Sequence, residues 1–141
     1  MLLLAQTFLG MITNLYVSIP ARHPGANAGN YFAGILSGVP WAIGHAPVAL
    51  ALHASLGIAL AAASLAALAR AARTRIRTEI ALAALAAATI FGAGFDGGSF
   101  LNYNHTVSSL IMTGCALLAT AAYTFSLATQ HTRPTGPPRP R

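Results

Sequence analysis

Long stretches of this chain carry no Asp, Glu, Lys or Arg, and they constrain its fold more than any other feature. They include residues 46–69, 80–95 and 97–132. A helix needs about 20 mostly apolar residues to cross the hydrocarbon core of a bilayer. The chain is 55% hydrophobic and only 7% charged, whereas soluble domains carry about 25% charged residues. We therefore expect an all-α integral membrane protein rather than a soluble, Ala-rich bundle.

The apolar runs predict one domain, residues 1–132, with four transmembrane helices at about 1–19, 46–69, 78–95 and 106–129. The first run ends at Pro20 and lacks the basic region of a signal peptide. Its abrupt apolar beginning is also what an upstream start codon would produce. The tail, residues 133–141, is rich in Pro and Arg and is expected to be disordered.

Two connections of unequal length are expected at one end of this bundle. Residues 20–44 begin with an irregular stretch and continue with an apolar segment, 31–41, which Gly34, Gly38 and Pro40 interrupt. That segment is too short to span, and its aromatic residues suit the headgroup level of a membrane. Residues 96–104 have the composition of a turn-rich loop.

Arginine positions predict the orientation of the four spans. The chain has no Lys, and seven of its eight Arg lie in residues 70–77 or in the tail. Basic residues accumulate in cytoplasmic loops, so both termini and residues 70–77 are expected inside. Basic residues that flank apolar spans argue against nucleic acid as a partner. The abundance of Ala and Arg indicates a GC-rich bacterial genome, hence a multi-pass protein of the bacterial cytoplasmic membrane.

Polar residues gather at the predicted outer end and form the candidate site. We expect an outer polar cluster of His23, Asn27, Asp96, Asn102, Tyr103 and Asn104. Three histidines, His45, His53 and His105, lie at or just below the same level, and they are the candidate cofactor ligands. A histidine inside a membrane is a functional hypothesis, because unpaired ring nitrogens are costly in lipid.

Several chemical interpretations of these residues are open. The histidines could ligate haem b or, with Asp96, a metal ion, or they could be hydrogen-bonded structural residues. Ser99, Asp96 and His105 could form a hydrolytic set, although no nucleophile elbow accompanies them. The single cysteine, Cys115, is best explained as a small apolar residue between helices.

Two sequence stretches carry a family resemblance. Residues 96–105 (Asp-Gly-Gly-Ser-Phe-Leu-Asn-Tyr-Asn-His), residues 108–112 (Ser-Ser-Leu-Ile-Met) and residues 23–27 (His-Pro-Gly-Ala-Asn) resemble small four-span membrane proteins of actinobacteria and related prokaryotes. That family has no assigned reaction, so the resemblance implies the architecture and little more. A weaker likeness, through His53 and His105, is to four-helix b-type cytochromes, which implies haem b.

These observations favour a polytopic membrane protein without enzymatic activity, such as an accessory or structural subunit. Its expected partners are the lipid bilayer and other membrane subunits or further copies of itself. The alternative is a small redox protein that holds haem b or a metal through the outer histidines. A transport component is a third class, and it would need oligomerisation because four Ala-rich helices enclose little pore.

Overall fold

The computed structural model describes residues 1–105 and 107–131. These residues form five helices and no strand: α1 (Leu2–Tyr16), α2 (Tyr31–His45), α3 (Val48–Thr74), α4 (Arg77–Tyr103) and α5 (Ser108–His131). Helices α3, α4 and α5 are long and apolar enough to cross a membrane, and α1 is a shorter apolar helix. The expected all-α fold is confirmed, and these helices indicate a membrane protein.

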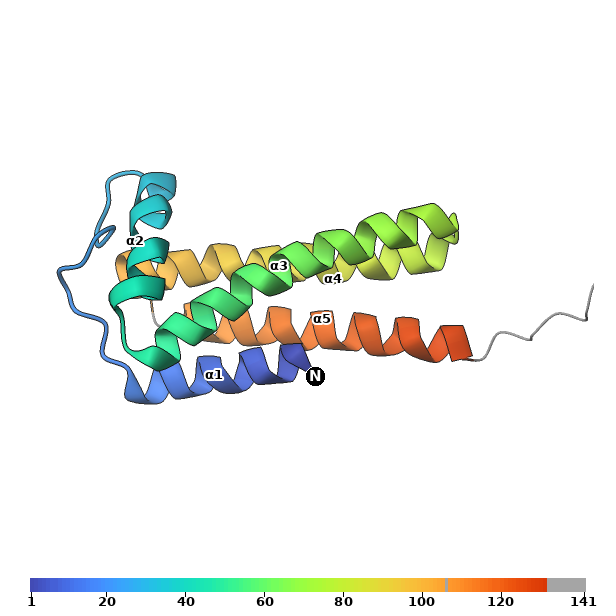
Figure 1. Ribbon diagram of the computed structural model, residues 1–141, viewed down its shortest axis with the longest axis horizontal. Helices are drawn as coiled ribbons and strands as arrows, with labels where there is room; N and C mark the ends of the chain where they lie inside the picture. Colours follow the sequence, from blue (N-terminus) through green and yellow to red (C-terminus); the bar gives the residue numbers. More distant parts are fainter. Residues whose placement is uncertain (106, 132–141) are drawn as a thin grey trace, which may run out of the picture.

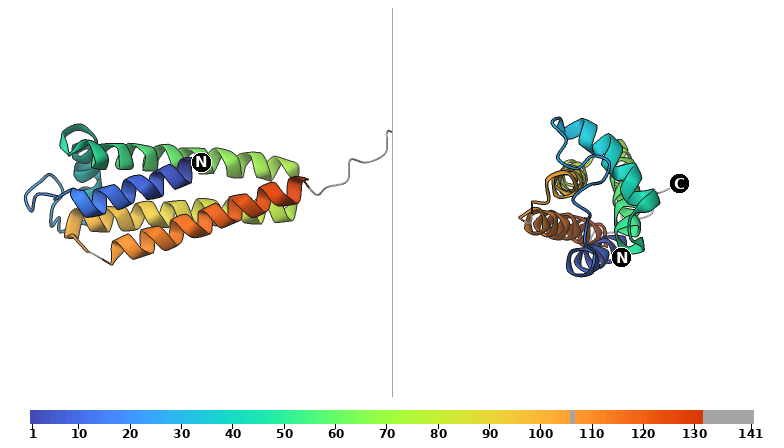
Figure 2. Two further views of the ribbon diagram at one scale, coloured as in Figure 1. Left: turned by 90° about the horizontal axis from the view of Figure 1, so that it is seen from below. Right: turned by 90° about the vertical axis from the view of Figure 1, so that its left-hand side faces the viewer.

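Four of the helices lie along one axis and the fifth closes an end (Figure 1). Helices α1, α3, α4 and α5 run lengthwise, whereas α2 lies across the bundle beside the loop 17–30. We call this the cap end. At the opposite end, which we call the arginine end, Arg75 and Ile76 join α3 to α4. Figure 2 shows that α1 begins about halfway along the bundle and runs toward the cap end.

Small residues let the long helices approach closely. Helix α4 contacts α2, α3 and α5, and its buried positions include Ala83, Ala86 and Ala87. Leu60, Ile90 and Ala119 join three helices in one buried cluster. Close packing of this kind supplies dispersion contacts in a membrane, where no hydrophobic effect drives the helices together.

A pair of alanines on α4 tests this packing. Ala86 is fully buried, whereas Ala84 is exposed. Ala86→Leu should lower the free energy of unfolding by about 1–3 kcal/mol through overpacking, and Ala84→Leu should change it little. Thermal unfolding of both variants in one detergent measures the difference. Equal midpoints would show that α4 does not use this face for close packing.

The exposed surface of the bundle is strongly apolar. Large side chains such as Phe8, Leu52, Leu65, Leu118 and Phe125 are each more than half exposed. Soluble monomers rarely expose continuous apolar areas of this kind, and lipid tails cover them without a penalty. The surface therefore agrees with a membrane environment for the long helices.

The prediction of a loop at residues 96–104 is wrong, because α4 continues without a break to Tyr103. Its glycines serve packing rather than a turn. A Cβ on Gly98 would lie 2.6 Å from the Tyr31 hydroxyl oxygen, and one on Gly97 would lie 3.2 Å from Met112 Sδ. Tertiary contacts with α2 and α5 thus outweigh the low helix propensity of glycine.

The apolar segment after residue 30 is a regular helix, although interruption by Gly and Pro was predicted. Asn30 caps α2, because its side-chain oxygen accepts a hydrogen bond from the Ala33 N–H at 3.1 Å. Pro40 lies inside the helix. Gly34, Gly38 and Ala42 recur at intervals of four residues and form the buried face of α2.

The remaining boundaries move by a few residues. Helix α1 ends at Tyr16 and α3 continues to Thr74, so Arg70 and Arg73 lie in a helix rather than a loop. Arg75 ends α3 in the left-handed region, with φ of 57°. Helix α5 runs from Ser108 to His131. The predicted disordered tail, residues 133–141, lies outside the described residues.

Candidate functional site

The loop 17–30 is fastened to the last turn of α4. The Asn27 N–H donates to the Asn102 carbonyl oxygen at 2.7 Å, and the Tyr103 hydroxyl donates to the Ala28 carbonyl oxygen at 3.1 Å. Asn27 adopts a left-handed conformation, with φ of 50°, which Asn tolerates better than most residues. Two segments far apart in the sequence, 23–27 and 96–105, therefore touch at the cap end.

Asn102 is the central residue of the cap end. Its side chain is 2% exposed, and its Nδ2 donates to the Tyr31 carbonyl oxygen at 3.3 Å. Gly34 lies directly against this side chain, and a Cβ on Gly38 would lie 3.6 Å from its Oδ1. Asn102 therefore joins α4 to both the loop 17–30 and α2.

His23 holds the same loop from the other side. Its Nε2 lies 3.1 Å from the Leu101 carbonyl oxygen and its Nδ1 lies 2.9 Å from the Pro24 carbonyl oxygen. The ring stacks on Trp41 of α2, with centroids 4.4 Å apart. A neutral imidazole donates through one nitrogen only, so the tautomer decides which of the two contacts is a hydrogen bond.

Tyr31 ties the beginning of α2 to α4. Its hydroxyl donates to the Phe95 carbonyl oxygen, and its ring contacts that of Phe95 with centroids 4.3 Å apart. Burial raises the pKa of Tyr31 above its ordinary value, an effect that a hydrogen bond with Ser99 reduces. The phenol therefore stays protonated and remains a donor over the physiological pH range.

A small pocket lies beside these contacts, where α4 gives way to α5. It has a volume of about 450 Å³ and is lined by Asp96, Asn104, His105, Val107, Ser108 and Ile111. Asn104 ends α4 with φ of 53°. Ser99, the nucleophile of the hydrolytic interpretation, does not line this pocket but interacts with Tyr31. The structure thus brings Asp96 and His105 to one pocket but leaves Ser99 outside it.

The three candidate cofactor ligands have different surroundings. His45 is exposed at the end of α2. His105 is exposed and contacts the Tyr103 ring, with centroids 5.6 Å apart. His53 lies on α3 and faces α1, where a Cβ on Gly10 would lie 2.9 Å from its Cε1.

The contact between α1 and α3 around His53 is polar and tight. Gln6 Nε2 donates to the His53 carbonyl oxygen at 3.1 Å. Gln6, Gly10 and Thr13 share one face of α1, and the His53 ring packs on this face at Gly10. Gln6 Oε1, Thr13 Oγ1 and His53 Nδ1 are all buried without a partner among the described residues. Buried polar atoms of this kind are commonly bridged by internal water.

Two other polar residues toward this end of the bundle, Asn14 and Asn102, have partners of their own. Asn14 Oδ1 accepts a hydrogen bond from Ser109 of α5 at 2.9 Å, and Asn102 donates to Tyr31. The sequence could not distinguish these pairings, because all of these residues lie near the same depth.

The residues around His53 do not fit a haem. A haem iron with two histidine ligands needs its rings to face one another across the macrocycle, whereas the His53 ring is packed against the backbone of α1 at Gly10. Within residues 1–105 and 107–131, no three His, Cys, Asp or Glu side chains are placed to hold one metal ion. The packing instead resembles that of a structural histidine between helices.

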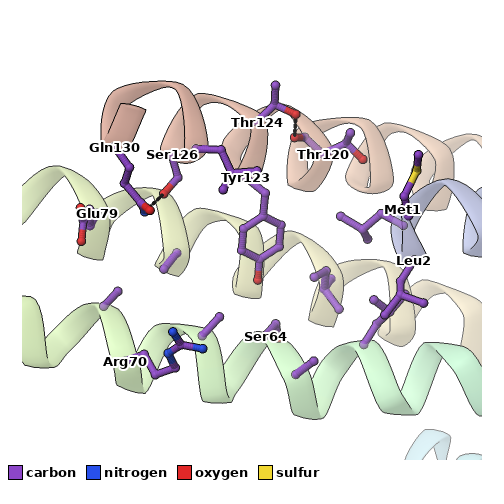
Figure 3. Close-up of a pocket in the computed structure, with 18 of the residues that line it drawn as sticks. Met1, Leu2, Ser64, Arg70, Glu79, Thr120, Tyr123, Thr124, Ser126 and Gln130 are labelled. Carbon is purple, nitrogen blue, oxygen red and sulfur yellow. Dashed lines mark hydrogen bonds between the residues drawn. The ribbon is translucent and has the colours of Figure 1, made fainter. Parts of the chain in front are cut away.

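A second, larger hollow lies at the arginine end and was not foreseen. It has a volume of about 960 Å³ and lies between α3, α4 and α5, beyond the beginning of α1. Figure 3 shows Met1 and Leu2 at one end of this groove and Arg70, Glu79 and Gln130 at the other. Which residues of α3, α4 and α5 line one groove depends on which faces of the helices meet, and no local sequence signal indicates that.

The chain was compared with protein families, curated proteins and solved structures, and it matches none of them. The resemblance to small four-span proteins of actinobacteria therefore stays a prediction. The structural features that bear on function are the cap end, the α1–α3 contact and the groove.

Proposed function

We propose that this chain is a four-span protein of the bacterial cytoplasmic membrane that acts as a non-enzymatic accessory or structural subunit. In this proposal α1, α3, α4 and α5 are the spans, the cap end faces outward and the arginine end lies in the cytoplasm. Other membrane subunits or further copies of the chain are its partners.

One observation carries the proposal. Several polar residues of the cap end bond to the backbone of the chain itself, although Asp96 Oδ2 and Asn102 Oδ1 are buried without a partner among the described residues. Asn102, Tyr103 and His23 each contact a carbonyl oxygen of a different segment, and the Asn27 N–H binds another. An active site instead needs polar groups directed at a substrate. This arrangement supports a rigid outer surface more than a reactive centre.

The distribution of charge supports the orientation. Arg70, Arg73, Arg75 and Arg77 all belong to the arginine end, and cytoplasmic segments carry an excess of such residues. Helix α1 is the shortest of the proposed spans. Its 15 residues extend about 22 Å, against a hydrocarbon core of about 30 Å.

The visible absorption spectrum separates this proposal from the redox alternative. Protein purified in detergent should be colourless before and after dithionite, should stay so after haem is added, and should carry no stoichiometric metal. His53→Ala should then lower the free energy of unfolding by about 1–3 kcal/mol, because it leaves buried polar groups without a partner. It should not change the absorption spectrum. A Soret band that His53→Ala, His45→Ala or His105→Ala removes, while His131→Ala does not, would contradict the proposal.

A further inference from the structure

We propose that the groove at the arginine end binds an anionic phospholipid of the cytoplasmic leaflet. The inference rests on the orientation proposed above and adds a ligand to the side of the protein opposite the cap. Three features of the groove support it: its depth, its apolar wall and the charge at its mouth.

The depth of the groove matches one leaflet. On α3 the lining residues run from Leu60 to Thr74, and the part between Leu60 and Arg70 extends about 15 Å at 1.5 Å per residue. Half of a hydrocarbon core of about 30 Å has the same depth. A phospholipid with its headgroup at Arg70 would therefore place its acyl chains along the groove toward Leu60.

Much of the wall of the groove is apolar, although hydroxyl groups also line it, among them that of Tyr123 (Figure 3). Ser64 donates to the Ala61 carbonyl oxygen and Thr120 to that of Ala116, each at 2.8 Å. Thr124 donates to the Thr120 carbonyl oxygen at the same distance. Because these hydroxyls donate within their own helices, they present mainly carbon atoms to the groove, beside Leu60 and Ile90. Acyl chains suit such a wall.

The mouth of the groove is basic. Arg70 lines it, and Arg73, Arg75 and Arg77 lie in the turn beyond. Glu79 also lines the groove but is 7% exposed and has an interaction of its own, so Arg70 is the exposed charged side chain among the lining residues. Basic pockets between helices on the cytoplasmic side bind anionic headgroups, and each Arg near the surface contributes about 1 kcal/mol. That energy corresponds to about fivefold in affinity.

Native mass spectrometry of the detergent-purified full chain tests the proposal with two probes, dioleoyl phosphatidylglycerol and dioleoyl phosphatidylcholine. We expect one phosphatidylglycerol per chain, retained about fivefold or more over phosphatidylcholine. Arg70→Gln should bring the two lipids close to parity. Arg77→Gln, which removes the same charge outside the groove, should retain most of the preference.

A second pair of variants tests the place of binding. Ala63 lines the groove, and its neighbour Ala62 is exposed elsewhere on α3. Ala63→Phe should abolish retention of phosphatidylglycerol, whereas Ala62→Phe should not, and circular dichroism should show equal helix content for both. Arg70 is exposed, so its substitution reports binding even if Ala63→Phe fails to fold.

Two results would overturn the proposal. One is equal retention of both lipids by the unaltered protein, and the other is equal behaviour of Ala63→Phe and Ala62→Phe when both fold. Orientation is read separately, by reporter fusions at the arginine end. A cytoplasmic arginine end without lipid preference would refute the lipid site alone, and an exported one would refute the orientation itself.

Discussion

Gly34→Ala should lower the free energy of unfolding by about 3 kcal/mol, although it adds a single methyl group. The new Cβ would overlap the side chain of Asn102, which is 2% exposed. Gly25 of the loop 17–30 also packs against Gly34 and Gly38, so the glycine face of α2 has little room for an added methyl group. Overpacking usually costs about 1–3 kcal/mol, and the burial of Asn102 places this change at the upper end.

Gly44 is the matched control, because it lies in the same helix and a Cβ there meets nothing within 4 Å. Gly44→Ala should raise stability by up to about 1 kcal/mol, since Ala loses less backbone entropy than Gly in a helix. Thermal unfolding followed by the fluorescence of Trp41, the only tryptophan, reports directly on the cap end. Changes of the same sign and size in both variants would show that α2 does not pack on Asn102.

The helical class could be predicted from the sequence because the physical constraint is strong. Uncharged runs of about 20 residues have few stable states other than membrane helices. The connections between the helices could be predicted only approximately, from Pro47 and from Gly-rich segments. Helix α3 begins at Val48, directly after Pro47, two residues from its predicted start. The prediction is this close because a proline near the beginning of a helix is a local sequence signal.

The continuation of α4 through residues 96–104 could not be predicted, because its cause is tertiary. Asp96, Gly97 and Gly98 are residues typical of turns. A helix is favourable there because Tyr31 packs on Gly98 and Met112 packs on Gly97. The same holds for α2, whose glycines look like breaks in isolation and form its buried face in the structure.

The location of the outer polar cluster could be predicted from the sequence, but the hydrogen bonds of its residues could not. His23, Asn27, Asn102 and Tyr103 do meet at the cap end. Their partners are mostly backbone carbonyl oxygens, which no side-chain pattern encodes. The polar contact of Gln6 with α3 at His53 was missed for a related reason, since it depends on which faces of two helices meet.

Alkaline phosphatase fusions after residues 28, 75, 104 and 131 test the central claim, that four helices cross the membrane with the cap end outside. The enzyme is active only when exported. The account predicts activity after residues 28 and 104 and none after residues 75 and 131, because each proposed span reverses the side. Activity after residue 75 with none after residue 104 would contradict the orientation, and absence of activity after residue 28 alone would show that α1 does not cross.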